Sequence, residues 1–290
     1  MLPLISIVIP TFNSAPFLSD CLTSIVKQDY PNLEVVVVDN CSTDGTAAIV
    51  NRFPQLITRF ISEPDRGQPD AVTKGLRIAT GDIAHWQAAD DILLPQALHR
   101  VAAAFLADPN LTLVFSDGLS FDEHSVYAGA YSRFVDFWTS LLFFGRFQSD
   151  CAYWRHSATA GALPLDDRKP LMCDEDFFLR LWAGRSHKWI PQPLGAFRVR
   201  EGQLSQRLPK SLLAADRADS RQRVCAAMGL RRADVERLRR AYRRKWVIGS
   251  CLVPKIYSAA RFAARQLTLG YERRRYTHWL LNEWLQEKGV

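Results

Sequence analysis

The sequence predicts an α/β domain built around a mostly parallel central sheet. Residues 5–9 and 33–38 are apolar runs rich in valine and isoleucine, each with a single polar residue, Ser6 or Glu34, which is typical of parallel strands buried on both faces. Between them, residues 15–28 carry apolar side chains at helical spacing. A strand, a helix and a second strand in succession form a βαβ unit, whose crossover is right-handed almost without exception.

The alternation of strands and helices continues along the chain, as a sheet with helical crossovers requires. The pattern weakens after residue 121, and a short helix at residues 175–183 and one or two strands within residues 188–199 follow it. Ligands of such sheets bind at the carboxyl ends of the strands. The further elements that we expect before residue 121 are strands at 56–61, 82–87 and 111–116 and helices at 46–53, 69–79 and 95–107.

Composition excludes several classes of protein. The 290 residues are 48% hydrophobic, which is typical of a globular chain and not of a disordered one. None of the six cysteines belongs to a CxxC pair, so we predict reduced thiols in a cytosolic protein, without a zinc site or a disulfide framework. The apolar residues 1–10 lack a basic flank, and we expect a buried strand there, not a signal peptide. No apolar run is long enough for a membrane-spanning helix.

Charge divides the chain into two parts. Residues 1–206 hold 17 Lys and Arg against 23 Asp and Glu, whereas residues 207–290 hold 20 against 7. The split predicts an acidic body followed by a basic helical extension. Three interpretations of the extension stay open: it lies on an anionic membrane surface, it packs on the body or on another subunit of a homo-oligomer, or it binds nucleic acid. No nucleic-acid-binding fold is visible, so we do not expect a nucleic-acid partner.

The exits of the first three predicted strands carry residues suited to a nucleotide. The first strand ends in the sequence PTFN, residues 10–13, and the second ends in Asp39. Backbone N–H groups and short polar side chains at such exits lie beside bound nucleotides, although an ordinary βα turn has the same composition. Asp65 lies at the third exit and can contact a base, and Arg66 and Lys74 can offset phosphate charge. For Lys74 a solvated helix surface is an equal alternative.

Two acidic clusters lie further along the chain. Asp90 and Asp91 follow the apolar residues 82–89. Adjacent carboxylates in an apolar setting repel each other unless a cation or hydrogen-bond donors compensate, and such a pair at a strand exit can hold a divalent cation on phosphate oxygens. The second cluster, DED at residues 174–176, can supply a general base, although acidic residues at a helix start also suit the helix dipole.

The order and spacing of these motifs resemble glycosyltransferase family two. The resemblance covers residues 4–206 and implies an inverting nucleotide-sugar transferase of the GT-A fold, whose Rossmann-like, mostly parallel sheet is flanked by helices. It implies a nucleotide-sugar half at residues 1–118 and an acceptor half at residues 119–206, followed by the helical extension at residues 207–290. The motifs that carry it are PTFN at 10–13, VDNCSTDGT at 38–46, DRG at 65–67, ATGD at 79–82 and ADD at 89–91.

The resemblance implies roles for residues at the donor end. Asp39 and Asp65 would contact the nucleotide base, commonly uracil. Asp90, with Asp91, would bind the Mg²⁺ or Mn²⁺ ion that bridges the diphosphate. The nucleotide-binding residues that it implies are Pro10, Thr11, Asn13, Asp39, Asp65, Arg66, Lys74, Ala89 and Asp90.

Two positions depart from the family's pattern. The family often has Asp or Asn where this chain has Ala88, and His where it has Arg200. Arginine cannot ligate a cation, but it can pair with phosphate oxygens and stabilise the leaving group. Arg200 is therefore expected at the diphosphate, where a fixed positive charge takes over part of the metal's work.

The cluster at residues 174–176 resembles the family's second acidic motif, Glu-Asp before an aromatic residue at a helix start. By that match Asp176 is the catalytic base, and Glu175 orients the acceptor or Asp176. The implied reaction is metal-assisted transfer from a UDP-sugar to a glycan or lipid-linked acceptor in cell-surface polysaccharide or glycolipid assembly. We expect a cytoplasmic protein that is peripheral on the inner face of the cell membrane where the extension binds lipid.

Two alternatives to a glycosyltransferase are considered. A nucleotidyltransferase shares a nucleotide site and acidic metal ligands, but usually needs a Gly-rich, Lys- or Arg-bearing loop that residues 10–13 do not supply. A non-catalytic protein that binds sugar nucleotides or serves as a scaffold is suggested by Ala88 and Arg200.

Overall fold

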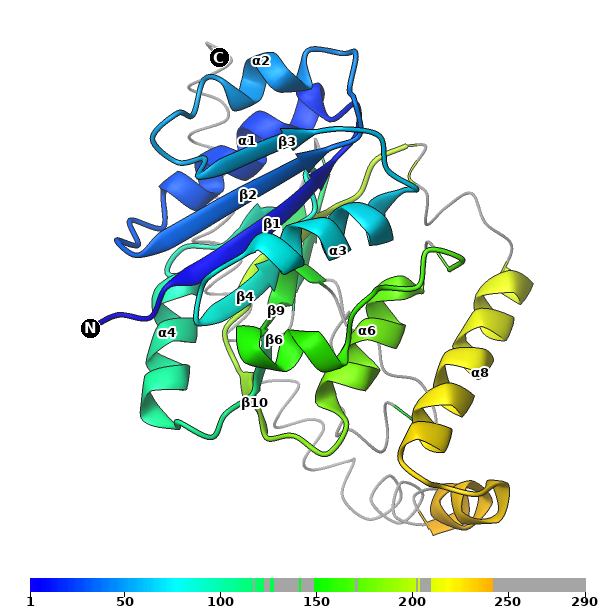
Figure 1. The fold of residues 1–290 in the computed structure, drawn as a ribbon. Coiled ribbons are helices and arrows are strands. Elements are labelled where there is room, and N and C mark those ends of the chain that lie inside the picture. Colours follow the sequence, from blue (N-terminus) through cyan, green and yellow to red (C-terminus); the bar gives the residue numbers. More distant parts are fainter. Residues whose placement is uncertain are drawn as a thin grey trace.

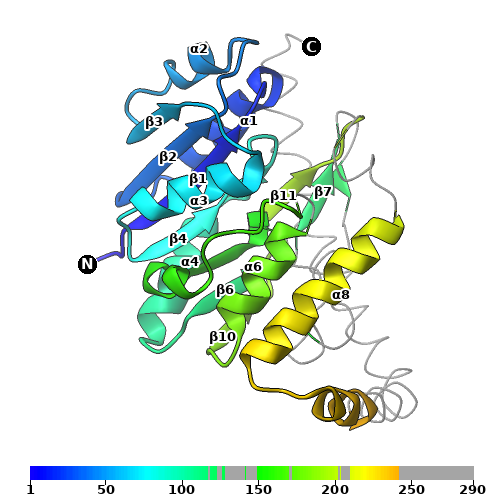
Figure 2. The same ribbon diagram turned by 45° about the vertical axis from the view of Figure 1, so that its right-hand side comes forward.

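Two β-sheets and the helices around them form the structure (Figures 1 and 2). The computed structural model describes residues 1–116, 118–122, 126–127, 141, 149–169, 172–201, 203 and 210–241. The larger sheet has seven strands, in the order β10 (His187–Ile190), β6 (Leu113–Ser116), β9 (Ala152–Arg155), β4 (Ile83–Trp86), β1 (Ile5–Thr11), β2 (Leu33–Asp39) and β3 (Arg59–Ser62). The smaller has four, in the order β5 (Ile92–Leu93), β11 (Gly195–Arg198), β7 (Leu119–Phe121) and β8 (Val126–Tyr127).

Parallel pairing aligns the ends of three strands. β1 and β2 pair from Ile5 opposite Leu33 to Thr11 opposite Asp39. Every residue of β1 and all of β2 after its first residue are buried, as expected for strands covered on both faces. β3 pairs with β2 in the same direction and brings Ser62 opposite Asp39. The exits of β1, β2 and β3 therefore lie side by side at one edge of the sheet.

Helices cover the larger sheet on both faces. Ile5, Ile7 and Ile9 belong to the core that α1 (Ala15–Val26), α2 (Thr46–Val50) and α4 (Ala97–Ala107) complete. Val8 belongs to the opposite core, which α3 (Gln68–Ile78) and α6 (Cys173–Trp182) complete. Adjacent side chains of a strand point to opposite faces, so β1 alone shows that the sheet is sandwiched. Figure 1 shows α3 and α6 in front of the sheet and α1 behind it.

Helix α3 lies unusually close to β1 at Gly75. A Cβ atom at this position would lie 2.3 Å from Cγ1 of Val8 and 3.3 Å from Cγ2 of Val38. We expect Gly75→Ala to lower the free energy of unfolding by about 1–3 kcal/mol through overpacking, despite the better helix propensity of alanine. Urea denaturation measures the change. Arg77→Ala, on the exposed side of the same helix, should stay within about 0.5 kcal/mol, and an unchanged Gly75→Ala protein would contradict the close approach.

The structure confirms most of the predicted elements and corrects some of them. Helix α2 ends at Val50, before the predicted end at residue 53, and Pro54 follows closely, where it cannot extend a helix. Strand β3 begins at Arg59, after the predicted start at residue 56. Strand β9 was not predicted: it is short and runs antiparallel between β4 and β6, with Tyr153 opposite both His85 and Val114.

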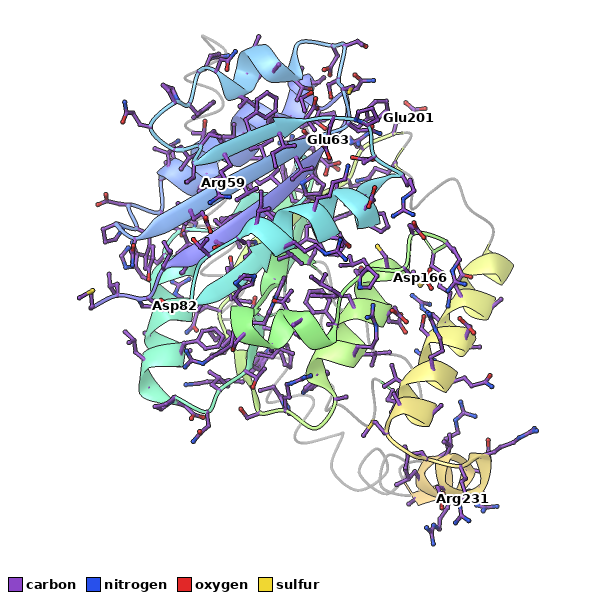
Figure 3. All side chains as sticks on the ribbon, in the orientation of Figure 1. Arg59, Glu63, Asp82, Asp166, Glu201 and Arg231 are labelled. Atoms are coloured by element: carbon purple, nitrogen blue, oxygen red, sulfur yellow. The ribbon has the colours of Figure 1, made fainter. Side chains whose placement is uncertain are left out.

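The first part of the basic extension is helical, as predicted. Helix α8 (Lys210–Ala227) runs beside α6 (Figure 2), and a second helix covers residues 232–241. Arg231 precedes that helix, is 85% exposed and points away from the body (Figure 3). None of the helices in the described ranges is long and apolar enough to cross a membrane. Residues 242–290 lie outside the described residues, so the interpretations of the basic extension there stay predictions.

Candidate functional site

Asp39 is the centre of a hydrogen-bond cluster at the exits of β1, β2 and β3. Thr11 Oγ1 donates to its Oδ1 at 3.1 Å, and Ser62 Oγ donates to its Oδ2 at 2.7 Å. Ser42 donates its N–H to Oδ2 at 2.9 Å and its hydroxyl to Oδ1. A carboxylate offers about four acceptor positions, so these bonds occupy Asp39, which is 1% exposed. Asp39 therefore shapes the exit loops, and its contact with a base stays a prediction.

The loop after β1 leaves one aromatic ring in solvent. Phe12 is 60% exposed, although large apolar side chains are usually buried. Asn13 has a left-handed backbone, with φ 46°, which asparagine adopts more readily than most residues. Its N–H donates to Ser42 Oγ at 2.8 Å, and its Oδ1 accepts the N–H of Thr43 at 3.0 Å. The prediction did not single out Phe12, although an aromatic residue inside a polar strand-exit motif was a signal for it.

Besides Asp39, three of the implied nucleotide-binding residues are buried. Pro10 and Thr11 lie at the end of β1, where Thr11 is 4% exposed, and Ala89 is 6% exposed within the core on the α1 side. They can reach a ligand only through backbone atoms or by supporting neighbours. Their direct contact with a nucleotide stays a prediction.

Asp65 joins the exit of β3 to the exit of β2. Its N–H donates to Asn40 Oδ1 at 2.9 Å, and its own Oδ1 accepts the N–H of Gly67 at 2.7 Å. Burial raises the pKa of the Asp65 carboxyl, although the bond from Gly67 acts in the opposite direction. The structure therefore brings Asp65 next to the loop that Asp39 organises, and a shared contact of the two residues with a nucleotide base stays a prediction.

Arg66 and Lys74 are engaged by carboxylates of their own region. Arg66 is 73% exposed and pairs with Asp70 at 3.1 Å and with Asp167 at 2.9 Å. Lys74 pairs with Glu63 at 2.7 Å. Surface pairs of this kind contribute about 0–1 kcal/mol each, so they can exchange for another anion. A phosphate contact of either residue stays a prediction.

The structure brings Asp90 and Arg200 together. β11 pairs antiparallel with β5, Ala196 opposite Ile92, and thereby lays the residues after β11 against the acidic pair. Arg200 Nε donates to Asp90 Oδ2 at 2.9 Å, and its guanidinium lies 4.8 Å from the centre of the Phe17 ring. The Arg200 side chain is 38% exposed. Its two terminal amino groups have no partner within the described part of the chain.

Arg198 holds the backbone around the same acidic pair. Its N–H donates to Asp91 Oδ1 at 2.8 Å, its Nε to the Asp90 carbonyl oxygen at 2.8 Å and its Nη2 to Asp20 Oδ2 at 2.7 Å. Asp91 is 2% exposed. Burial, followed by the charges of Asp150 and Asp90, raises the pKa of the Asp91 carboxyl well above its usual range. Asp91 is thus a buried anchor for β11.

Protein groups engage both carboxylates of the predicted metal site. Mg²⁺ at such a site needs one or two carboxylates, together with water and substrate phosphates, whereas here one oxygen of Asp90 faces Arg200 and the buried Asp91 accepts a backbone N–H. Across the residues that the structure describes, no three His, Cys, Asp or Glu side chains gather where they could hold a metal. The metal roles of Asp90 and Asp91 stay predictions, and the cation that the structure places on Asp90 is Arg200.

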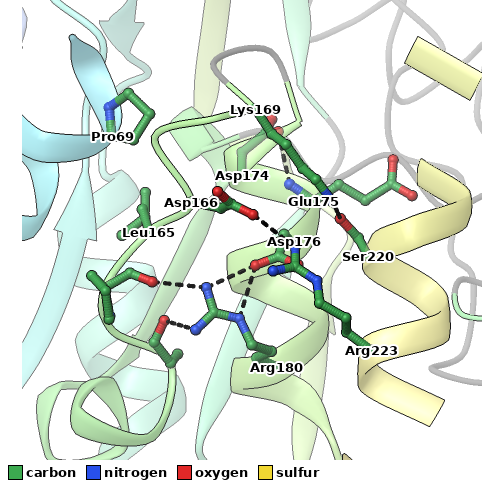
Figure 4. A network of polar contacts seen from close by, with 12 residues as sticks. Pro69, Leu165, Asp166, Lys169, Asp174, Glu175, Asp176, Arg180, Ser220 and Arg223 are labelled. Carbon is green, nitrogen blue, oxygen red and sulfur yellow. Dashed lines mark hydrogen bonds and ion pairs between the residues drawn. The ribbon is translucent and has the colours of Figure 1, made fainter. Parts of the chain in front are cut away.

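The predicted catalytic base is enclosed by arginines (Figure 4). Asp176 is 1% exposed. Its Oδ2 accepts Arg180 Nε at 2.9 Å, and its Oδ1 accepts Arg223 Nη2 at 2.9 Å. Arg180 also donates to the carbonyl oxygen of Pro164 at 3.1 Å, so Asp176 links α6, α8 and the loop before α6. This geometry leaves Asp176 little access to an acceptor hydroxyl.

Glu175 is likewise buried and paired with arginines, both of which come from a single helix. It is 4% exposed, its Oε2 accepts Arg217 Nε at 2.8 Å and its Oε1 accepts Arg221 Nη2 at 3.0 Å. Both arginines belong to α8. An orienting role of Glu175 towards an acceptor stays a prediction, because both carboxylate oxygens face α8.

Asp174 differs from its two acidic neighbours. It is partly exposed, and its Oδ1 accepts the N–H of Glu175 at 2.7 Å. No lysine or arginine among the described residues pairs with it. Burial by its surroundings raises the pKa of the Asp174 carboxyl from 3.8 to about 7, with the charge of Glu175 acting in the same direction. A carboxyl group with this pKa can accept a proton near neutral pH, as a general base must.

The second acidic cluster opens α6, and Figure 2 draws this helix in front of the sheets, with α8 beside it. The strand β11 leads into Arg200 and Asp90.

Comparison with known proteins identifies a family and several relatives of this chain. Residues 6–157 match the family model described as glycosyl transferase family 2. A PGL/p-HBAD biosynthesis glycosyltransferase of Mycobacterium bovis is 33% identical over 185 residues, covering 62% of this chain and 70% of that protein. The poly(ribitol-phosphate) beta-N-acetylglucosaminyltransferase TarS of Staphylococcus aureus is 35% identical over 108 residues, covering 35% of this chain and 18% of TarS.

Solved structures share the arrangement of sheet and helices. TarS 1–349 of S. aureus in complex with UDP matches with a TM-score of 0.63 and 18% identity, covering 87% of this chain and 73% of that one. The mannosyltransferase PcManGT from Pyrobaculum calidifontis, in complex with GDP-Man and Mn²⁺, matches with a TM-score of 0.59 and 21% identity, covering 96% and 84%. These two likenesses show the fold alone, and they confirm the predicted fold class.

Proposed function

The chain belongs to glycosyl transferase family 2, and from this premise we propose that it transfers a sugar from a nucleoside diphosphate donor to an acceptor hydroxyl with inversion. A UDP-sugar is the expected donor, because two of the matched TarS structures are complexes with UDP and UDP-GlcNAc. The matched PcManGT structure holds GDP-Man, so the base is part of the proposal.

The observation that carries the proposal is that Asp174 is accessible and not paired with a described cation. Of the three carboxylates that open α6, it alone keeps partial exposure and lacks a cationic partner within the described residues, and its pKa is about 7. We assign the general base to Asp174 in place of the predicted Asp176. Asp174 takes the proton of the acceptor hydroxyl as its oxygen attacks the anomeric carbon. A single displacement from the face opposite the diphosphate inverts that carbon.

The donor end is assigned to an aromatic ring and an arginine. Phe12 projects from the exit of β1 at 60% exposure, where a base can stack on it. The terminal amino groups of Arg200 can pair with diphosphate oxygens and offset the charge that develops on the leaving group. Because Asp90 is engaged by Arg200, we derive no step through a divalent cation.

The acceptor and the location are part of the same proposal. The mycobacterial relative is named for PGL/p-HBAD biosynthesis, and TarS is named as a poly(ribitol-phosphate) transferase. These names support an acceptor from glycolipid or cell-surface polysaccharide assembly. A cytoplasmic enzyme that binds the inner face of the cell membrane through its basic extension would meet such acceptors.

Nucleotide-sugar binding tests the donor half of the proposal. We expect UDP-sugars to raise the melting temperature of the full chain and Phe12→Ala to weaken their binding about 5- to 150-fold, since stacking of a base on an aromatic ring contributes about 1–3 kcal/mol. Phe12→Tyr, which keeps the ring, is the matched control. Thermal unfolding with UDP, UDP-GlcNAc and GDP-mannose measures the first effect, and titration calorimetry with the same ligands measures the second.

The same panel separates the alternatives. Sugar transfer or donor hydrolysis by the wild type supports the transferase. Binding without turnover for any acceptor would indicate a non-catalytic sugar-nucleotide-binding protein, and release of pyrophosphate from UTP with a sugar phosphate would indicate a nucleotidyltransferase. No binding of any nucleotide sugar would overturn the proposal.

A further inference from the structure

Helix α8 faces the start of α6 with a row of ionic side chains. Arg217 and Arg221 both reach Glu175, at 2.8 and 3.0 Å, and Arg223 reaches Asp176 at 2.9 Å. Arg217 and Arg221 are four residues apart, so they lie on one face of α8, and Arg223 reaches Asp176 from a neighbouring face. Figure 4 shows the Arg223 side chain extending from α8 across to Asp176.

Further contacts tie α8 to the loop that precedes α6. Arg223 Nη2 also reaches Asp166 Oδ2 at 2.9 Å. Lys169, which is 6% exposed, pairs with Asp219 and lies 3.4 Å from Ser220 Oγ. The charges alternate across the contact: acids of α6 and its loop meet arginines of α8, and the lysine meets an acid of α8. Such complementarity fixes the register of one helix against the other.

The contact between α8 and α6 stabilises two buried carboxylates. Glu175 and Asp176 are 4% and 1% exposed, and a buried carboxylate is strongly unfavourable without a paired cation. Among the residues that the structure describes, Arg180 is the one cationic partner of these carboxylates that α6 itself supplies. The acidic turn of α6 therefore takes its native form only with α8 in place.

The residue next to this pairing is Asp174. The N–H of Glu175 donates to Asp174 Oδ1 at 2.7 Å, and both side-chain oxygens of Glu175 are held by α8. The orientation of the Asp174 carboxylate thus depends on a residue that α8 fixes. Arg217 also acts on Asp174 directly through its positive charge.

We propose that α8 is a positioning element of the acceptor-activating site, in which Arg217 and Arg221 act through Glu175 to orient Asp174. This inference rests on the proposed function. It places residues 210–227, which the charge pattern assigned to a separate extension, within the working enzyme. Arg217 and Arg221 are positioning residues and do not touch the substrate.

The charged groups that face Asp174 make the proposal testable through the pH at which Asp174 titrates. From α6 they are Cys173 and the negative Glu175, and from α8 the positive Arg217. Glu175 favours the protonated form of Asp174, whereas Arg217 favours the ionised form. Removing the two partners of one ion pair should therefore move the titration of the base in opposite directions, which loss of stability alone would not do.

The test follows kcat against pH for the full chain with a UDP-sugar that the wild type turns over. Arg217→Gln should move the acid limb of the profile to higher pH by about half a unit to one unit, and Glu175→Gln should move it to lower pH by a similar amount. Arg231→Gln makes the same change at an arginine that is 85% exposed, and should leave the limb in place. Arg221→Lys, which keeps a cation on Glu175, should retain more activity than Arg221→Gln.

The outcomes distinguish this inference from the proposed function. The positioning role is overturned if both single variants are active and the acid limb of their kcat–pH profiles does not move. It is also overturned if the limb moves in the same direction in both. A wild type that transfers no sugar overturns the proposed function instead. If Arg217→Gln does not fold, the Arg217→Gln/Glu175→Gln double variant removes both charges of the pair. Its limb should then lie above that of Glu175→Gln, and coincidence of the two overturns the role of Arg217.

Discussion

Replacing Asp174 by asparagine is expected to lower kcat about 10²- to 10⁴-fold, the usual contribution of a general base, and to leave donor binding unchanged. The amide has nearly the same shape and can still accept the N–H of Glu175 at its oxygen, but it cannot take a proton from the acceptor. Transfer from a labelled UDP-sugar measures kcat, and calorimetry with UDP measures donor affinity. Full activity of Asp174→Asn would refute the assignment.

Asp176→Asn is the matched variant two positions away. It removes the charge that Arg180 and Arg223 share and leaves two arginines beside a neutral group. Breaking a buried ion pair of this kind costs about 3–5 kcal/mol, so a lower melting temperature is expected, with a smaller loss of kcat per folded molecule. The reverse result, loss of kcat in Asp176→Asn with an intact fold and activity in Asp174→Asn, would restore Asp176 as the base.

The pH dependence of kcat follows from the same assignment. Burial raises the pKa of Asp174 to about 7, and only the ionised form accepts a proton. The base is therefore mostly protonated below this pH, and kcat should rise about tenfold per unit until it levels near pH 7. A profile that is already level at pH 5 would contradict a base with this pKa.

The fold was predictable because its pattern is local. Ile5, Ile7 and Ile9 alternate along β1, four successive valines form the middle of β2, and helical spacing appears between the two strands. Strand β9 escaped prediction because its pairing is not local: it lies between β4 and β6, whose partner residues are remote in sequence. A four-residue segment carries too little periodicity to show this.

The placement of the strand-exit residues was predictable, but the partners of the candidate site residues were not. The strand-exit motifs located Asp39, Asp65 and Asp90 because parallel strands end at one edge. The choice among the three carboxylates that open α6 depends on partners that the sequence does not reveal. Three of these partners are arginines of α8, which follow the carboxylates that they bind by 42, 46 and 47 residues in the sequence.

Donor binding is expected to withstand EDTA and to depend on Arg200. Arg200→Ala removes the guanidinium that we assign to the diphosphate, and a hydrogen bond to a charged group contributes about 1.5–3 kcal/mol. The affinity for UDP should therefore fall about 10- to 150-fold, whereas the affinity for uridine, which lacks the diphosphate, should not change. Arg231→Ala, at an exposed arginine of the extension, is the control. Calorimetry with both ligands, in EDTA and in Mn²⁺, measures the effect.

The variant Asp90→Asn distinguishes neutralisation of the diphosphate by Arg200 from neutralisation by a bound divalent metal ion. If Arg200 neutralises the diphosphate, the variant frees Arg200 Nε from its carboxylate, and UDP affinity in EDTA should be retained or increased. If Asp90 instead ligates a divalent cation, the variant should lose the metal-stimulated activity. Activity that disappears in EDTA, returns with Mn²⁺ and is absent from Asp90→Asn would show that the donor or the ion displaces Arg200 from Asp90. Arg200 would then pair with Asp90 only in the free enzyme, and the metal roles that the sequence predicts for Asp90 and Asp91 would be supported.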